Sequence, residues 1–295
     1  MEFNWLEDFI ALSETGNFSR AAELRHVTQP AFSRRIRALE DWVGIELFDR
    51  NPQGVVLTEA GRIFKPGAEE TVRRVSQLCS ETREAANVQA TTLRFAATHA
   101  LSFTFFPQWI RKLAPSGAIS LISDSMLACE QVMMQGEAQF LLCHHHDGAQ
   151  GRFDPAQFLS ARVGTDRLML LSAPAPNGGA LWSVPGDGKS VDYLAYSVES
   201  GLGRIAMARQ GKDALFMALR PVVTSRLAAT LQSMARDGRG LAWLPYSVAK
   251  DDIAADRLVR AADPLTDIEM EIRLFRPRAR LSAAAEKFWA NLSAQ

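Results

Sequence analysis

The chain has few cysteines and no stretch that could cross a membrane. Its three cysteines, Cys79, Cys129 and Cys143, form an odd set with wide spacing, which matches neither a disulfide framework nor a CxxC metal site. No segment approaches the roughly 18 uncharged apolar residues of a membrane span. The N-terminal residues carry acids where a signal peptide carries bases. We therefore expect a cytoplasmic protein with reduced thiols.

Net charge is also lacking, because 33 Lys and Arg balance 33 Asp and Glu. Residues 1–62 hold seven Arg, no Lys and ten Asp or Glu, which gives a net charge of −3. Residues 18–37, however, carry five arginines against one acid, Glu23. If this part of the chain binds DNA, a local basic patch rather than a basic domain must make the contact.

The motifs of common enzymes are absent from the sequence. It contains no GxSxG turn, no phosphate-binding loop, no GxGxxG after an expected strand and no recognisable catalytic Cys–His pattern. We therefore expect neither catalysis nor a cofactor. An enzyme or a solute-binding protein built on the C-terminal part is the alternative, although a solute-binding protein would need a secretion signal.

At 295 residues, with 47% hydrophobic and 22% charged residues, the chain fits a folded protein of two domains. The first 60 residues show three short helical patterns followed by a hairpin. Apolar residues recur at helical spacing over Trp5–Leu12, Ser19 is expected to cap a second helix and Thr28 a third. Residues 47–50 and 55–58 flank a turn and predict two strands, so this part reads as a winged helix-turn-helix.

A long amphipathic segment follows, from Thr58 to about Ala90. Its apolar residues recur at every third or fourth position, and a single apolar stripe outside a globular core predicts dimerisation. Pro66-Gly67 is expected to kink this helix or to set its start. The stripe comprises Ile63, Phe64, Ala68, Val72, Val75, Leu78, Cys79, Ala85 and Ala86.

From Thr92 onward, strand patterns alternate with helical patterns, which predicts parallel-rich α/β sheets. The chain is expected to leave one α/β lobe near Val163 and to return near Leu265, because the last strand and helix lack other partners. Two lobes with a cleft would follow. The expected strands are residues 92–97, 118–123, 139–144, 166–173, 193–197, 220–224, 240–243 and 269–275.

Five runs of residues together resemble LysR-type transcriptional regulators. The resemblance spans the chain and is most specific over residues 1–61. It implies that the chain binds double-stranded DNA at an operator or promoter, senses a small-molecule effector or an oxidant, and forms a homodimer or homotetramer. The runs are Asn17–Ala22, Thr28–Glu40, Gly44–Arg50, Leu57–Gly61 and Gly238–Pro245.

The resemblance also implies an α+β fold with three parts. Residues 1–61 would form the winged helix-turn-helix, and residues 62–90 a linker and dimerisation helix. Residues 91–295 would form a two-lobed α/β effector-binding domain resembling periplasmic binding proteins. Lobe I is expected to contain residues 91–163 and 265–295, and lobe II residues 164–264.

In such a domain the third helix enters the major groove, where each base pair shows its own pattern of donors and acceptors. Gln29, Ser33 and Arg34 are the candidates for base edges. Arg37 and Thr28 would contact phosphates. Arg50, at the wing, would reach into a narrow minor groove or contact a phosphate. A solvated arginine face is the alternative interpretation. The DNA-binding candidates are Thr28, Gln29, Pro30, Ser33, Arg34, Arg37 and Arg50.

The effector site is expected where strands end. Residues 98–102 join the first strand of the domain to a helix, and free N–H groups at a helix start bind anions, although ordinary capping by Thr or Ser explains them equally. Cys143–Asp147 suggests a metal site, but adjacent histidines on a strand alternate in direction, so we expect a polar strand exit and no metal. The candidates for ligand contact are Thr98, His99, Ser102, His144, His145, Ser197, Ser200 and Thr224.

The run at residues 29–40 and Ala242–Pro245 look most like a hypochlorite-responsive branch of the family. Oxidant sensing in that branch is attributed to methionines, and this chain has nine. No shared constellation of methionines follows from one sequence. Met133, Met134 and Met169 are expected to fill the core, because thioethers pack irregular gaps well.

Overall fold

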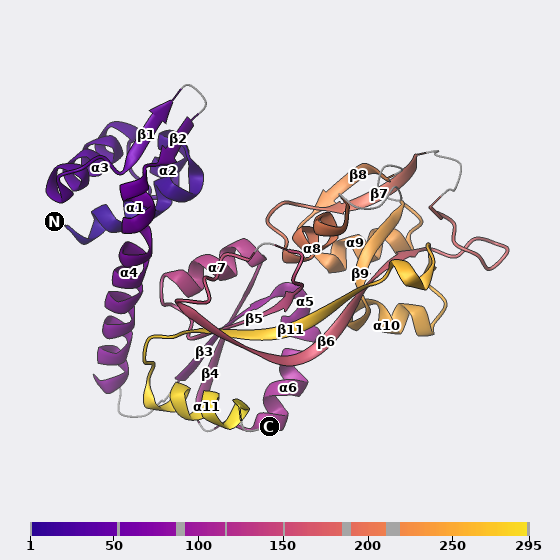
Figure 1. Ribbon diagram of the computed structural model, residues 1–295. Helices are drawn as coiled ribbons and strands as arrows, with labels where there is room; N and C mark the ends of the chain where they lie inside the picture. The colour runs from indigo at the N-terminus through magenta and orange to yellow at the C-terminus, as the bar shows by residue number, and fades with distance from the viewer. Residues whose placement is uncertain are drawn as a thin grey trace. The chain divides into compact units, whose positions relative to one another are not determined.

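The computed structural model describes residues 2–51, 54–86, 92–115, 117–149, 151–184, 190–210 and 219–293. The chain divides into two compact units (Figure 1). One unit contains Met1–Asn87 with Met134–Glu137, and the other contains Val88–Met133 with Ala138–Gln295. Within the described ranges, no helix is both long and apolar enough to span a membrane.

The N-terminal unit has the expected order of three helices and a hairpin. Its core is built from the buried faces of the helices and the first strand, with Phe9, Phe32 and Ile36 fully buried. The Phe9 ring contacts the rings of Phe48 and Phe64, each with its centroid 5.1 Å away. The elements are α1 (Phe3–Thr15), α2 (Phe18–Leu24), α3 (Gln29–Val43), β1 (Phe48–Asn51), β2 (Gly54–Leu57) and α4 (Glu59–Ala86).

The caps of two helices differ from the expectation. The Asn17 side chain caps α2 by accepting hydrogen bonds from the backbone N–H groups of Ser19 and Arg20, at 2.9 and 3.1 Å. Ser19 therefore lies inside the helix, and the prediction that it is the cap is wrong. Thr28 does occupy the cap position of α3, but its side chain makes no capping hydrogen bond.

Helix α4 is continuous over 28 residues, so Pro66 lies inside it and does not mark its start. The expected apolar stripe divides into two parts. Ala68 and Val72 are each 3% exposed and belong to the core of the N-terminal unit, which corrects the expectation that the whole stripe lies outside a core. Ile63 and Leu78, in contrast, are 74% and 59% exposed.

One carboxylate connects α3 to the wing formed by β1 and β2. Glu40 Oε1 accepts hydrogen bonds from the backbone N–H groups of Leu47 and Phe48, at 2.9 and 3.1 Å. At the other end of the wing, the Val55 N–H donates to the carbonyl oxygen of Gly16 at 3.1 Å. Gly16 has a left-handed backbone with φ of 61°, which glycine adopts without strain. The hairpin is thus held at both ends by the helices.

The C-terminal unit contains a continuous sheet in the order β4-β3-β5-β11-β6-β9-β7-β8, and β10 pairs with β6. Strand β3 pairs in parallel with β4 and β5, and β7 pairs in parallel with β8 and β9. The prediction of parallel-rich α/β lobes is confirmed. The strands are β3 (Thr92–Thr98), β4 (Ala118–Asp124), β5 (Phe140–His145), β6 (Phe158–Ser172), β7 (Val191–Tyr196), β8 (Leu219–Ser225), β9 (Leu241–Pro245), β10 (Val259–Arg260) and β11 (Ile268–Pro277).

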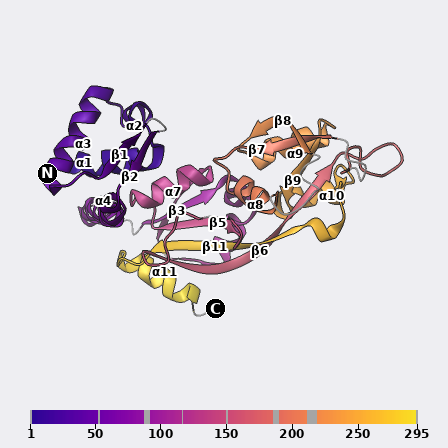
Figure 2. The ribbon, with the colours of Figure 1, turned by 45° about the horizontal axis from the view of Figure 1, so that its top comes forward.

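Two long antiparallel strands, β6 and β11, join the two lobes and run side by side in both ribbon views (Figures 1 and 2). Each lobe has its own apolar core, one around Phe95 and Phe140 and the other around Leu194 and Trp243. The helices are α5 (His99–Thr104), α6 (Phe106–Leu113), α7 (Met126–Met134), α8 (Gly201–Gln210), α9 (Ala228–Arg236), α10 (Tyr246–Ala254) and α11 (Ala283–Ser293), with a short 3-10 turn η2 (Pro264–Thr266).

The Glu40 contacts predict a specific loss of stability. In Glu40→Ala, the N–H groups of the buried residues Leu47 and Phe48 lose their acceptor. A buried donor without a partner costs about 1–3 kcal/mol, so urea denaturation of the full chain should show a fall of that order in the unfolding free energy of the N-terminal unit. Glu40→Gln keeps an acceptor oxygen and should lose less. Equal losses in the two variants would contradict this role of Glu40.

Candidate functional site

The N-terminal unit brings three of the predicted DNA-binding residues to one concave surface. Gln29 and Ser33 on α3 and Arg50 on β1 line a hollow of about 360 Å³, together with residues of the α1–α2 turn and β2. Thr28 and Pro30 are exposed at the start of α3, and Arg34 and Arg37 are exposed further along it. The seven candidates therefore all lie at or near the surface of α3 and the wing.

Ion pairs separate the arginines of the basic patch into two groups. Arg25 and Arg35 both contact the fully buried carboxylate of Asp8, at 2.8 and 3.4 Å. Arg34 and Arg37 make no ion pair within the described part of the chain, and their side chains are exposed. The second group has guanidinium groups available for phosphates or bases, whereas the first group has a structural role.

Arg50 is held at the wing by two contacts. Its guanidinium lies over the Phe18 ring, 4.9 Å from the centroid, and 3.9 Å from Glu40 Oε2. The side chain is 43% exposed. These contacts position a positive charge beside the hollow and leave part of it open to a partner.

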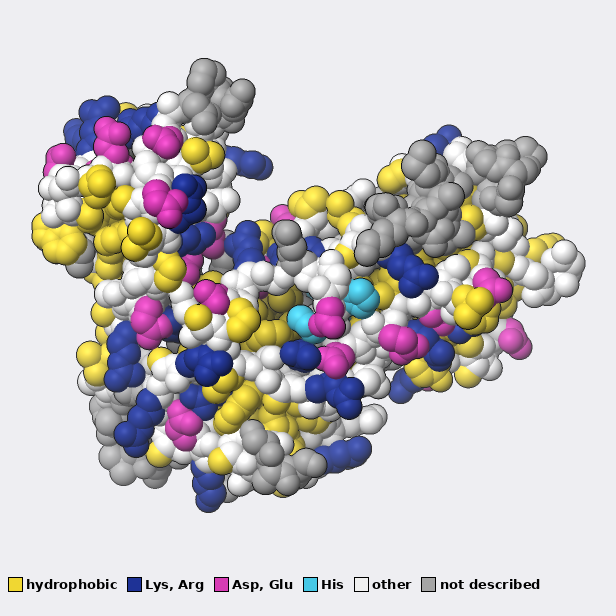
Figure 3. Space-filling model, viewed as in Figure 1, with side chains coloured by type: hydrophobic (Ala, Val, Ile, Leu, Met, Phe, Trp, Pro, Cys, Tyr) yellow, Lys and Arg dark blue, Asp and Glu magenta, His cyan; other side chains and the backbone are white. Residues whose placement is uncertain are grey.

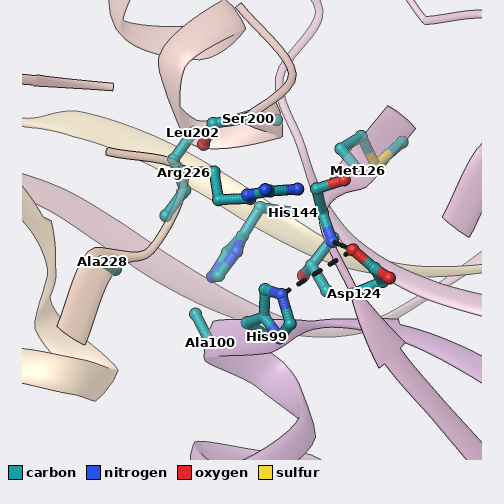
Figure 4. Close-up of a pocket in the computed structure, with 12 residues that line it drawn as sticks. His99, Ala100, Asp124, Met126, His144, Ser200, Leu202, Arg226 and Ala228 are labelled. Atoms are coloured by element: carbon teal, nitrogen blue, oxygen red, sulfur yellow. Dashed lines mark hydrogen bonds and ion pairs between the residues drawn. The ribbon is translucent and has the colours of Figure 1, made fainter. Parts of the chain in front are cut away.

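The C-terminal unit has a small polar cavity between its two lobes (Figure 4). Its volume is about 30 Å³, which exceeds the space needed for one water molecule and is small for an organic ring. Lobe I contributes the carboxyl ends of β3, β4 and β5, and lobe II contributes the start of α8 and the turn after β8. Polar groups at the carboxyl ends of parallel strands commonly form ligand sites.

Three basic side chains enter this cavity. Figure 4 shows Arg226 and the imidazole rings of His99 and His144 in the same space, with Asp124 to one side. His99 Nδ1 lies 3.2 Å from Ser123 Oγ, and its Nε2 lies 3.9 Å from Asp124 Oδ1. The Arg226 guanidinium is 3.6 Å from the Glu199 carboxylate and is 56% exposed. The side chains of Arg226 and His99 thus each have an exposed carboxylate nearby and remain partly open to the cavity.

His144 is the buried member of the set. Its Nε2 lies 2.9 Å from Asp166 Oδ2, and both side chains are 2% exposed. Ser247 donates to the same carboxylate from its hydroxyl at 2.6 Å and from its backbone N–H at 3.1 Å. Burial alone would raise the pKa of Asp166, but the hydrogen bonds and the charge of His144 lower it below the usual value. The ionised carboxylate therefore holds the His144 ring in a fixed orientation.

The structure brings together four of the eight predicted ligand-contact residues. Thr98, His99, His144 and Ser200 all line the cavity. Ser102 does not line the cavity, but it accepts a hydrogen bond at 2.8 Å from Ser123 Oγ, which also lies beside His99. The other three candidates do not line this cavity: His145 lines a neighbouring one, Ser197 contacts Ser225 through its backbone N–H, and Thr224 is exposed on β8.

Sequence reasoning missed Asp124, Met126 and Arg226, which line the same cavity. A signal for two of them was present, because Asp124 directly follows the expected strand 118–123 and Arg226 comes two residues after the expected strand 220–224. Ligand-contacting side chains collect at such strand ends in open α/β sheets. Met126 carries no comparable signal.

The cysteines and methionines have contrasting environments. Burial raises the pKa of the Cys129 thiol to about 12 and that of Cys143 well above its ordinary value, so neither is a thiolate at neutral pH. Met133 and Met169 are buried, as expected of core residues, whereas Met134 is only partly buried. In the described ranges, no group of three or more His, Cys, Asp or Glu side chains is placed to hold a metal ion.

The sequence matches known regulators over nearly its whole length. Residues 3–62 match the bacterial regulatory helix-turn-helix protein of the lysR family, and residues 86–295 match the LysR substrate binding domain. The HTH-type transcriptional regulator YjiE of Escherichia coli K12 is 28% identical over 295 residues, which cover 99% of this chain and 94% of that protein.

Two solved full-length structures have the same fold. HypT from Salmonella typhimurium, described as a hypochlorite-specific LysR-type transcriptional regulator, is 28% identical with a TM-score of 0.60, over 100% of this chain and 98% of that one. Vibrio fischeri DarR in complex with DNA is 29% identical with a TM-score of 0.58, over 100% and 99%. This chain therefore belongs to the LysR family of DNA-binding transcriptional regulators, with a helix-turn-helix at its N-terminus and an effector-binding domain at its C-terminus.

Proposed function

We propose that this protein works in the cytoplasm and changes its contacts with DNA when a small anion binds between the lobes of its effector domain. The observation that carries the proposal is the convergence of Arg226 from lobe II with His99 and His144 from lobe I on one small cavity. An anion there would bridge groups from both lobes and favour one arrangement of the lobes over another.

We assign one role to each of three parts of the chain. Residues 1–61 bind double-stranded DNA, residues 62–90 form the linker and dimerisation helix, and residues 91–295 bind the effector. Within this last part the chain leaves lobe I for lobe II near residue 163 and returns near residue 265. Exposed Ile63 and Leu78 on α4 offer apolar surface for a second copy, as a homodimer or homotetramer requires. Two such N-terminal units would contact two half-sites on DNA.

The base-reading role is assigned to Gln29, Ser33 and Arg34, and the phosphate role to Arg37, Thr28 and Arg50. Gln29, Ser33 and Arg50 share one hollow, and the exposed arginines of α3 make no ion pair within the described residues. Pro30 sets the start of α3, where its missing N–H costs nothing. Together these placements favour insertion of the start of α3 into the major groove.

Arg34→Ala should weaken binding to an operator selected from a random-sequence library by about 1–3 kcal/mol and relax the preference at one base. Arg37→Ala, the matched variant, should weaken binding to all sequences alike and lower the salt slope by about 1. Fluorescence anisotropy at several salt concentrations measures both effects. If Arg34→Ala weakened specific and unrelated DNA equally, the base-reading role would be wrong.

The anion proposal makes a prediction about Arg226. Titrating the full chain with nitrate or acetate should raise its unfolding midpoint saturably, because a ligand that binds only the folded state stabilises it, by about 2.7 kcal/mol at a hundredfold excess over Kd. Arg226→Ala should lose this shift. Arg220→Ala is the matched control, because Arg220 is an exposed arginine on β8, the strand that precedes Arg226, and pairs with Asp192. A shift that survives in Arg226→Ala would overturn the assignment.

Asp166 predicts how stability depends on pH. A carboxylate whose pKa is depressed by folding stabilises the fold above its unfolded pKa, about 4, and loses that contribution as the pH falls through its lower folded value. The difference in unfolding free energy between wild type and Asp166→Asn should therefore be largest near neutral pH and shrink below about pH 4. Denaturant titrations at several pH values test this, with the exposed Asp251→Asn as control. A difference that is constant across this range would contradict the role of Asp166.

We further propose that the protein is close to the hypochlorite-responsive branch, with an oxidant as the second candidate signal. The full-length likeness to HypT supports this, and so does the placement of two methionines. Met126 lines the cavity, and Met207 on α8 is 56% exposed. Hypochlorous acid would transfer its oxygen atom to the thioether sulfur, giving methionine sulfoxide and releasing chloride and a proton.

Hypochlorite at stoichiometric amounts should oxidise exposed Met207 before buried Met133 and Met169, because reaction requires access to the sulfur. Peptide mass spectrometry measures the order of oxidation, and DNA binding is measured in parallel. Treatment with methionine sulfoxide reductase should reverse any change in DNA binding, and Met207→Leu is the control. A change in DNA binding without any sulfoxide, or one that the reductase leaves in place, would exclude methionine oxidation as the signal.

A further inference from the structure

A second cavity lies beside the first in the effector domain and differs from it in size and chemistry. Its volume is about 150 Å³, against about 30 Å³ for the anion cavity. The two cavities share the side chains of Met126 and His144 and the backbone of Gly201. The remaining lining residues are different, so these shared groups form a partition between two separate spaces.

The larger cavity has an apolar interior contributed by both lobes. Phe153 and Phe275 place their rings with centroids 5.1 Å apart on the lobe I side, and Ile205 of α8 faces them from lobe II. An apolar space of about 150 Å³ has room for a benzene-sized group. Burying such a ring against aromatic and aliphatic side chains is favourable at roughly 25 cal/mol per Å² of apolar surface removed from water.

The rim of this cavity supplies hydrogen-bonding groups. Arg204 forms a two-bond ion pair with the buried Glu130 carboxylate, at 2.6 and 2.9 Å, and Arg152 lies 3.5 Å from the same carboxylate. His146 Nδ1 accepts the N–H of Gly148 at 3.0 Å. Figure 3 shows histidine side chains reaching the surface of the effector domain. An oxygen that accepts a hydrogen bond therefore suits the rim.

We propose that this cavity is a second ligand site, which takes a small neutral aromatic molecule carrying one hydrogen-bonding oxygen. The ring occupies the space between Phe153, Phe275 and Ile205, and the oxygen faces the histidines and Arg204 at the rim. Because Met126 and His144 line both cavities, an occupant of this site changes the affinity of the anion site. The site itself does not depend on whether an anion is the effector.

Phenol is the probe, because it combines a benzene ring with one oxygen. Calorimetric titration of the full chain should show saturable binding of one phenol per chain. Ile205→Trp fills the cavity from α8 and should weaken phenol binding at least about tenfold, whereas Arg226→Ala should bind phenol within about twofold of wild type. Circular dichroism checks the fold of each variant. If Ile205→Trp does not fold, Ala149→Phe fills the same cavity from another lining position.

The two proposals can fail separately in this experiment. Ile205→Trp should keep the nitrate-induced rise of the unfolding midpoint, which Arg226→Ala should lose. Absence of saturable phenol binding to the wild type, or unchanged binding in the folded cavity-filling variant, overturns the second site whatever nitrate does. Loss of the nitrate shift in wild type while phenol still binds overturns only the anion proposal.

Discussion

The effector domain depends on the antiparallel pairing of β6 with β11. Ile268–Pro277 pairs with β6 over ten residues, while β11 also borders β5 of lobe I and β6 also borders β9 of lobe II. The lobes are therefore joined by backbone hydrogen bonds that continue from one sheet to the other. A change in their relative orientation has to twist this pair of strands. The shift of register between Ile272 and Arg273 is an irregularity of the kind that increases local twist.

Asp166 lies on β6 at the place where the strand passes from one lobe to the other. It binds His144 of β5 and Ser247 at the start of α10, and thereby connects both lobes through one buried carboxylate. Because His144 also lines both cavities, a ligand that contacts this histidine acts on the joint between the lobes. Separating the buried Asp166 carboxylate from its partner is costly. The His144 ring is therefore held in one position when it meets a ligand.

Much of the fold could be predicted from periodicity, and the sites only in part. The strands of both lobes and the wing follow from alternating apolar residues and turn residues, but β6 begins at Phe158, eight residues before the expected start. Residues 159–164 alternate apolar with polar or small residues, a strand pattern that the expected strand leaves out, and they pair with β11. Arg226 was missed although it follows an expected strand end, because which strand ends face each other depends on how the two lobes meet. Asn17, two positions earlier, took the capping role expected of Ser19, and its side chain accepts hydrogen bonds from two N–H groups.

The negative charge of the first 62 residues is compatible with binding DNA because two carboxylates close to the arginine patch are engaged inside the N-terminal unit. Asp8 is fully buried and pairs with Arg25 and Arg35, and the Glu40 carboxylate is occupied by the backbone of the wing. Neutralised or buried carboxylates contribute little to the potential at the surface of α3, since the nearest cations cancel their field and salt screens the remainder within about 10 Å. The field that a phosphate meets is then set by the exposed arginines of α3, so local placement decides the sign of the contact and net charge does not.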